Sequence, residues 1–100
     1  MASSPEYLEY VLDLLRGVPE VTHRKMMGEY LLYSGGVLFG GVYDDRFLLK
    51  DTSAAREAFP EEQVPYEGAS PMLLAGSEDP ARIADVVYAM IPELPKPKKR

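Results

Sequence analysis

Short turn signals divide the middle of this chain into β-rich runs, and their spacing constrains the fold more than any other feature. Residues 29–34, 37–43 and 46–50 are rich in aromatic and aliphatic side chains. Gly35-Gly36 separates the first two runs, and Asp44-Asp45 separates the last two. Connections of two or three residues between such runs are typical of antiparallel hairpins, whose turns favour glycine and aspartate. The sequence therefore predicts an antiparallel sheet.

An amphipathic helix is expected before these runs, over residues 4–17. Apolar side chains recur in it three and four positions apart, and Pro5 suits its first turn. Ser3 or Ser4 can act as the N-cap, and Glu6 is placed to close a capping box on Ser3. This helix supplies one apolar face for the sheet.

The remaining segments complete an α+β pattern. A further β-rich run covers residues 21–27, and two short strands are expected at 64–67 and 71–75, where prolines favour sheet edges. A short helix is expected at 53–58, and a longer one begins at Pro80 with Asp79 as its cap. The predicted order is α-β-β-β(-β)-α-β-β-α, with helices packed on an antiparallel sheet. Residues 1–95 are expected to form a single domain, followed by a basic tail at 96–100.

Gly40 and Gly41 lie inside a predicted strand and need a separate explanation. A phosphate-binding loop requires a helix directly after its glycines, with lysine and serine or threonine following, and neither glycine pair of this chain has that context. Glycine inside a strand usually marks a bulge or the close approach of another group. A second subunit, a partner strand and a helix of this chain are the three candidates for that group.

The composition argues against catalytic or metal chemistry. The chain has no cysteine and one histidine, His23, so a thiolate site is excluded and a histidine cluster cannot form. Asp44 and Asp45 are adjacent, and neighbouring strand residues point to opposite sides of a sheet. We therefore expect no metal, no cofactor and no enzymatic activity.

Charge bears on the choice of partner. Four of the 11 basic residues lie at positions 96–100, which leaves residues 1–95 with a net charge of −9 against −5 for the whole chain. An acidic body repels nucleic-acid phosphates. Arg24, Lys25, Arg46 and Lys50 can still form one modest positive patch on the sheet, or can instead balance the nearby aspartates. With no apolar run long enough to cross a bilayer, no membrane partner is expected.

Residues 26–74 resemble the N-terminal domain of the TfoX/Sxy family, known for regulators of bacterial competence. The resemblance is carried by five short segments: Met27-Gly28-Glu29-Tyr30, Gly36-Val37-Leu38-Phe39, Asp44-Asp45-Arg46 with Lys50, Pro65-Tyr66-Glu67-Gly68, and Pro71-Met72. It implies an α+β fold like that of secretion chaperones, which bind proteins and are commonly dimers. It implies no catalytic residue.

The function predicted from the sequence is therefore a cytoplasmic, non-enzymatic protein-interaction module linked to competence or transcription regulation. Its partner would be another protein or a second copy of the chain. The candidate interaction residues are Arg24, Lys25, Tyr30, Gly40, Gly41, Asp44, Asp45, Arg46, Lys50 and Tyr66. The alternative is a regulator that binds nucleic acid weakly through the basic sheet patch and the tail.

Overall fold

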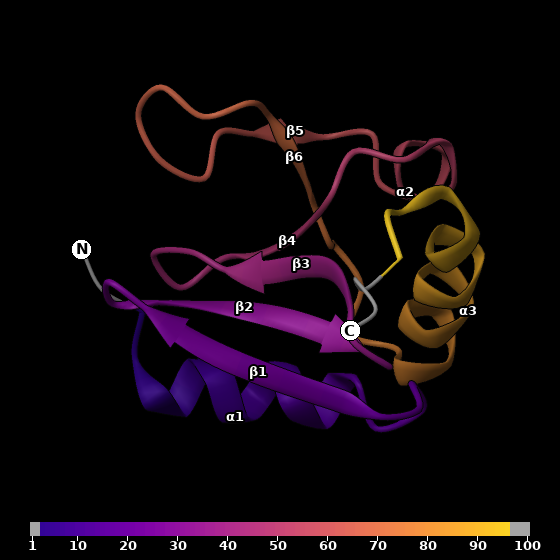
Figure 1. Ribbon diagram of the computed structural model, residues 1–100, viewed down its shortest axis with the longest axis horizontal. Coiled ribbons are helices and arrows are strands. Elements are labelled where there is room, and N and C mark those ends of the chain that lie inside the picture. The colour runs from indigo at the N-terminus through magenta and orange to yellow at the C-terminus, as the bar shows by residue number, and fades with distance from the viewer. Residues whose placement is uncertain (1–2, 97–100) are drawn as a thin grey trace.

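The computed structural model describes residues 3–96, and its centre is one six-stranded antiparallel sheet (Figure 1). The strand order is β1-β2-β3-β4-β6-β5. The strands are β1 (Val21–Met26), β2 (Glu29–Ser34), β3 (Val37–Val42), β4 (Phe47–Leu49), β5 (Glu62–Gln63) and β6 (Met72–Leu74), and the helices are α1 (Pro5–Leu14), α2 (Ser53–Ala58), α3 (Pro80–Met90) and a 3-10 turn at Ile91–Glu93. The predicted fold class and element order are confirmed.

The main core lies between the helices and one face of this sheet. Val11 of α1 and Ile83 of α3 are fully buried against Leu32, Phe39 and other apolar strand residues. Figure 1 shows α1 running beneath β1 and β2, with α3 at the end of the sheet. Within residues 3–96 the opposite face carries no helix, and that difference between the two faces positions the site described below.

Three hairpins join the first four strands through two-residue turns. All six central residues have positive φ, between 52° and 86°, in the turns Met27-Gly28, Gly35-Gly36 and Asp44-Asp45. Positive φ at both central positions defines the type I′ turn, whose twist matches that of the strands it joins. The hairpin turns predicted at the glycine and aspartate pairs are confirmed.

Gly40 and Gly41 are required by neighbouring strands of the same chain. Gly40 pairs with Leu32 and the next pair is Tyr33 with Leu38, so Phe39 is an extra residue in β3 and forms a bulge. A Cβ atom on Gly40 would collide with the carbonyl oxygen of Leu48, and one on Gly41 would lie 2.6 Å from the carbonyl oxygen of Tyr30. The missing side chains thus let β2, β3 and β4 approach one another.

The start and end of α1 differ from the prediction. Ser4 is the N-cap, and its hydroxyl accepts a hydrogen bond from the Tyr7 amide at 3.1 Å. The predicted capping box on Ser3 was wrong, because the Ser3 hydroxyl instead donates to the Glu29 carboxylate at 3.0 Å. The helix also ends at Leu14 rather than at residue 17, since Leu15 leaves the helical conformation and its amide is shared between two carbonyl groups.

The short strands of the β5–β6 hairpin (residues 62–74) are also displaced from the prediction. β5 covers residues 62–63 rather than 64–67, and β6 covers 72–74 rather than 71–75. Pro65 has no amide to donate to a neighbouring strand, and its carbonyl accepts from the Arg46 side chain instead. Residues 64–71 therefore form a loop. Of the predicted basic tail, only Lys96 lies within the described residues.

Glu93 links the end of α3 to the start of α2 and makes stability depend on pH. Its carboxylate accepts bonds from the Ser53 amide at 2.9 Å, the Ser53 hydroxyl at 2.8 Å and the Ala54 amide at 3.2 Å. The Ser53 bonds, chiefly, hold the pKa of Glu93 below its ordinary value of 4.5. A carboxyl with a lowered folded-state pKa stabilises the protein above its unfolded pKa, and this contribution is lost as pH falls through the folded value.

We therefore expect Glu93→Gln to lower the urea midpoint at pH 6, with the difference from wild type shrinking stepwise below pH 4.5. Urea unfolding curves at a series of pH values measure this. Glu9→Gln on the exposed side of α1 is the matched control and should leave a constant, near-zero difference. A Glu93→Gln difference that is independent of pH would contradict the assignment.

Candidate functional site

The helix-free face of the sheet has its own buried residues, which the β5–β6 hairpin covers. Leu31 pairs with Gly41, Gly41 with Leu48, and Leu48 with Leu74, so these residues share one row across the sheet. Leu48 is fully buried and Tyr43 nearly so, yet neither belongs to the cluster beneath the helices. The two side chains are therefore the floor of a second, smaller apolar layer.

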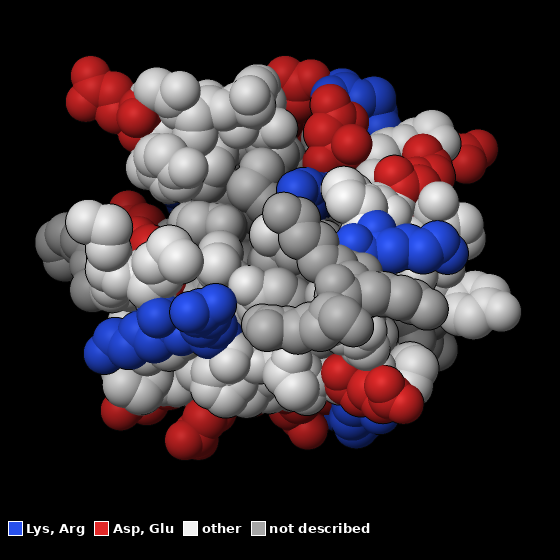
Figure 2. Space-filling model, in the orientation of Figure 1, with Lys and Arg blue, Asp and Glu red and all other residues white. Residues whose placement is uncertain are grey.

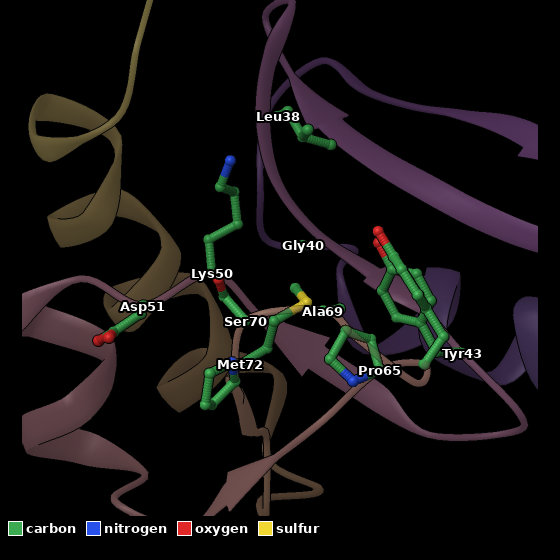
Figure 3. Close-up of a pocket in the computed structure, with 11 residues that line it drawn as sticks. Leu38, Gly40, Tyr43, Lys50, Asp51, Pro65, Ala69, Ser70 and Met72 are labelled. Atoms are coloured by element: carbon green, nitrogen blue, oxygen red, sulfur yellow. The ribbon is translucent and has the colours of Figure 1, made fainter.

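A groove runs across this face between β3 and the loop at residues 64–71. It consists of two cavities of about 380 and 430 Å³ that share Tyr43 and Tyr66. We call it the open-face groove. Leu38, Lys50 and Met72 line its first half, while Met26, Met27 and Leu31 line its second half. Figure 3 shows the first half, with Leu38 of β3 and Tyr43 just after β3 on one side, and Met72 and Pro65 on the opposite wall.

The second half of the groove exposes large apolar side chains. Met27 is 96% exposed, Tyr66 62% and Met26 47%. Figure 2 shows that the visible described residues in the middle of the molecule are mostly uncharged, whereas the carboxylates lie around its outline. Clustered exposed apolar residues with a polar rim are typical of interaction surfaces. None of these three side chains is needed by the core.

Arg46 holds the covering loop in place. Its guanidinium donates to the Gln63 side chain at 3.1 Å and to the carbonyl oxygens of Val64 at 3.2 Å and Pro65 at 3.1 Å, while its Nε donates to the Tyr43 carbonyl at 3.2 Å. Planar guanidinium donors suit such a fan of fixed acceptors. Arg46 thus positions one wall of the groove and does not balance the neighbouring aspartates through these contacts.

Two tyrosines connect the halves of the groove. The Tyr43 and Tyr66 rings lie 6.3 Å apart between centroids, tilted at 48°, a favourable separation for an aromatic pair. Burial, followed by the neighbouring Tyr66, raises the pKa of the Tyr43 phenol. Tyr43 therefore stays protonated at neutral pH.

The predicted interaction residues are not brought together in one patch. Tyr66, Lys50 and Gly40 line the open-face groove. Arg24 pairs with Leu31 and shares its face, whereas Lys25 pairs with the core residue Tyr30 on the other side of β1.

Asp44 and Asp45 lie in a turn that contacts the start of α1. The Asp45 carboxylate accepts from the Ser4 amide at 2.8 Å, and the Asp44 amide donates to Glu29. Tyr30 is buried, with its ring edge against His23. These roles are structural, and they depend on contacts between residues far apart in the sequence.

The predicted interaction residues did not include the groove residues Leu31, Leu38 and Tyr43 or the three groove methionines, Met26, Met27 and Met72. Met27 did carry a usable signal, because a large apolar residue at a two-residue turn lies outside any buried strand face. Met72 carried none, since its place in the groove depends on the loop that precedes it.

Two further findings limit the chemistry of residues 3–96. In that range no three His, Asp or Glu side chains are grouped closely enough to hold a metal ion. Across the same residues, no helix has the length and apolar character that crossing a membrane requires.

Comparisons with known proteins identify a relative and a family. The chain is similar to a protein of Spirochaeta aurantia described as "Uncharacterized 12.7 kDa protein in trpE 5′region", at 36% identity over 104 residues that cover 100% of this chain and 90% of the relative. The family model of the TfoX N-terminal domain matches residues 13–87. This match spans three of the four helical segments and every strand, at least in part. The chain belongs to the TfoX N-terminal domain family.

Proposed function

We propose that this protein is a non-enzymatic regulatory module of the cytoplasm that binds a segment of a partner protein in the open-face groove. The observation that carries the proposal is the exposure of Met26, Met27 and Tyr66 around a groove whose floor, Tyr43, is already buried. Burying large apolar side chains is the main favourable term in protein association.

The shape of the groove favours an extended segment over a flat protein surface. The first half of the groove lies between β3 and the loop at residues 64–71, the second half lies beside the β1–β2 hairpin, and Tyr43 and Tyr66 line both halves. Aromatic and methionine side chains are enriched at the centres of protein interfaces. Methionine also adapts its shape to irregular partners.

The groove offers little for catalysis. Its charged lining residues are Lys50, Asp51 and Glu29. Asp51 is bonded to Arg56, and Glu29 accepts bonds from Ser3 and from the Asp44 amide. Neither carboxylate is paired with a second titratable group in the way that general acid–base catalysis requires.

A photo-cross-linking experiment tests the proposal. A benzophenone amino acid placed at position 27 or 66 in the full chain should capture the same protein in the native host. Placed at position 88, where Tyr88 of α3 is 80% exposed, it should not. Mass spectrometry of the cross-linked peptides identifies both the partner and the contact.

The capture must also depend on the groove. Leu31→Glu, which puts a charge into the second half of the groove, should abolish cross-linking at position 66 while leaving the circular dichroism spectrum unchanged. Equal capture from positions 27, 66 and 88 would contradict a specific groove. If only a second copy of the chain is captured, and light scattering gives the mass of a dimer, the groove mediates self-association and does not bind a different protein.

A further inference from the structure

Lys50 is the one groove cation without a neutralising partner among the described residues. Its backbone amide donates to the Phe39 carbonyl at 2.9 Å, and this bond fixes the Lys50 backbone directly after the last residue of β4. Within residues 3–96 the ammonium group makes no hydrogen bond or ion pair. Figure 3 shows it extended towards the open space on the Leu38 side of the cavity. Lys50 is half-buried beside an apolar wall, and an ammonium group in such a place favours an anionic ligand.

The neighbouring carboxylate does not fill this role. Asp51 accepts from Arg56 Nε at 3.1 Å and from its Nη2 at 2.9 Å, and these bonds lower the pKa of Asp51. Arg56 also donates to Glu62 at 2.7 Å. Figure 3 shows the Asp51 carboxylate pointing away from the Lys50 ammonium group. The first half of the groove therefore presents an uncompensated positive charge on a protein whose net charge is −5.

The distance between this charge and the exposed apolar residues determines how long a bound segment must be to contact both. Lys50 lies at the Leu38 end of β3, whereas Met27 and Tyr66 lie at the Tyr43 end. Leu38 and Tyr43 are five positions apart, which corresponds to about 16 Å in a strand. An extended ligand spans that length with about five residues. Because its side chains alternate between two faces, the two that enter the groove are about four or six positions apart.

We propose that the open-face groove selects an extended protein segment in which an acidic side chain precedes or follows an apolar one by about four or six residues. The carboxylate binds the Lys50 ammonium group, and the apolar side chain lies between Met27 and Tyr66. This inference rests on the proposed function and specifies the class of segment that the module binds.

A protein segment fits these contacts better than a nucleic acid does. Nucleic-acid affinity requires several cations along one path, because each phosphate contact contributes a share of counterion release. Here Arg46 is bonded to the β5–β6 hairpin, and Lys25 lies on the other face of β1. Arg24 shares the face of Leu31 but does not line the groove. One cation beside an apolar surface matches one carboxylate beside an apolar side chain.

The test is an array of nine-residue peptides in a serine–threonine background. Each carries glutamate at position 2 and phenylalanine at one of positions 4 to 8, and the array is probed with the full-length protein. Binding should be strongest with phenylalanine at position 6 or 8, and weaker at positions 5 and 7, where the ring points to the other side of an extended peptide, and at position 4, where the spacing is too short. Lys50→Gln should weaken the best peptide about tenfold, the effect of one hydrogen bond to a charged group.

Reversing the charge at position 50 distinguishes a loss of ligand recognition from a loss of folding. Lys50→Glu should lose the glutamate peptide and gain the peptide with lysine at position 2. Lys25→Glu, on the other side of β1, is the matched control and should leave the preference for glutamate unchanged. Binding should fall with added salt for the wild type.

The outcomes distinguish the two proposals. Phenylalanine peptides that bind without regard to glutamate or Lys50, but lose binding in Leu31→Glu, overturn this inference and leave the groove as a protein-binding site. Absence of binding by every peptide, with no capture at positions 27 and 66, overturns both. Displacement of the best peptide by acetate at equal concentration would mean that Lys50 binds a small anion. Displacement by a single-stranded oligonucleotide would mean that it binds nucleic acid. Either result would overturn the proposal that the groove selects a protein segment.

Discussion

Replacing Gly40 with alanine is expected to destabilise the protein by about 3 kcal/mol, the upper range for forcing an extra carbon into a packed interior. The new Cβ atom would collide with the Leu48 carbonyl oxygen and lie 3.2 Å from the Leu49 Cα atom. Both are backbone atoms of β4, so no rotamer change relieves the contact. The strands would have to separate where the main core and the groove floor meet.

Thermal unfolding followed by circular dichroism measures this effect. For a domain of this size, about 3 kcal/mol corresponds to a decrease in Tm of about 12–24 °C. Gly41→Ala should act in the same direction, because its Cβ atom would lie 2.6 Å from the Tyr30 carbonyl oxygen. Gly76→Ala is the matched control, since its nearest neighbour is 4.0 Å away, and it should be neutral or slightly stabilising. Equal Tm values for Gly40→Ala and Gly76→Ala would refute the close-approach explanation.

Replacing Arg46 with methionine is expected to release the wall of the groove. Methionine keeps much of the apolar stem but removes donors to four acceptors, three of them in the β5–β6 hairpin at 3.1–3.2 Å. Bonds from a charged donor contribute more than neutral ones, and water replaces part of them here, so a loss of about 2 kcal/mol is expected. Arg46→Lys should not restore the wild-type value, because one ammonium group cannot reach all four acceptors.

Hydrogen exchange locates the change as well as measuring it. The amide of Ala69, which bonds to the Tyr66 carbonyl, and that of Leu74, which bonds to the Glu61 carbonyl, should exchange faster in Arg46→Met. Amides of β2 should change much less. Arg16→Met is the control, because among the described residues the Arg16 side chain bonds only to the exposed Asp13, and it should change stability by less than about 0.5 kcal/mol. Uniform acceleration across β2 and the hairpin would mean global destabilisation instead of local release.

The elements that could be predicted from sequence are those whose signals are local. The cap and first proline of α3, the short helix at residues 53–58 and the turn pairs between strands depend on adjacent residues, and the structure has them as predicted. Phe39 illustrates the intermediate case. The glycines after it indicated a bulge, but only the register between β2 and β3 shows which residue is extra.

What the sequence did not reveal depends on contacts between distant segments. Arg46 was assigned to a basic patch because it was expected to share the sheet with other basic residues, yet three of its four acceptors lie 17 to 19 residues away. Asp45 was a candidate contact for a partner, and it instead bonds to Ser4, 41 residues earlier. Hydrophobic periodicity specifies which face of an element is buried but not which polar groups meet around a hairpin. The groove was therefore inaccessible to sequence reasoning even though Lys50 and Tyr66 were named.

The strand order divides the chain into two parts that lose different amounts of chain entropy when their strands pair. β1 to β4 follow one another in the sheet and in the sequence, so each pairing closes a turn of two residues and loses little chain entropy. The pairing of Leu48 with Leu74 instead closes a loop that contains α2 and β5, at a higher entropic cost. The open-face groove lies on the boundary between these parts. The proposed binding groove thus lies beside the strand pairing that has the highest entropic cost of loop closure. A bound segment that contacts both walls of the groove would stabilise this pairing.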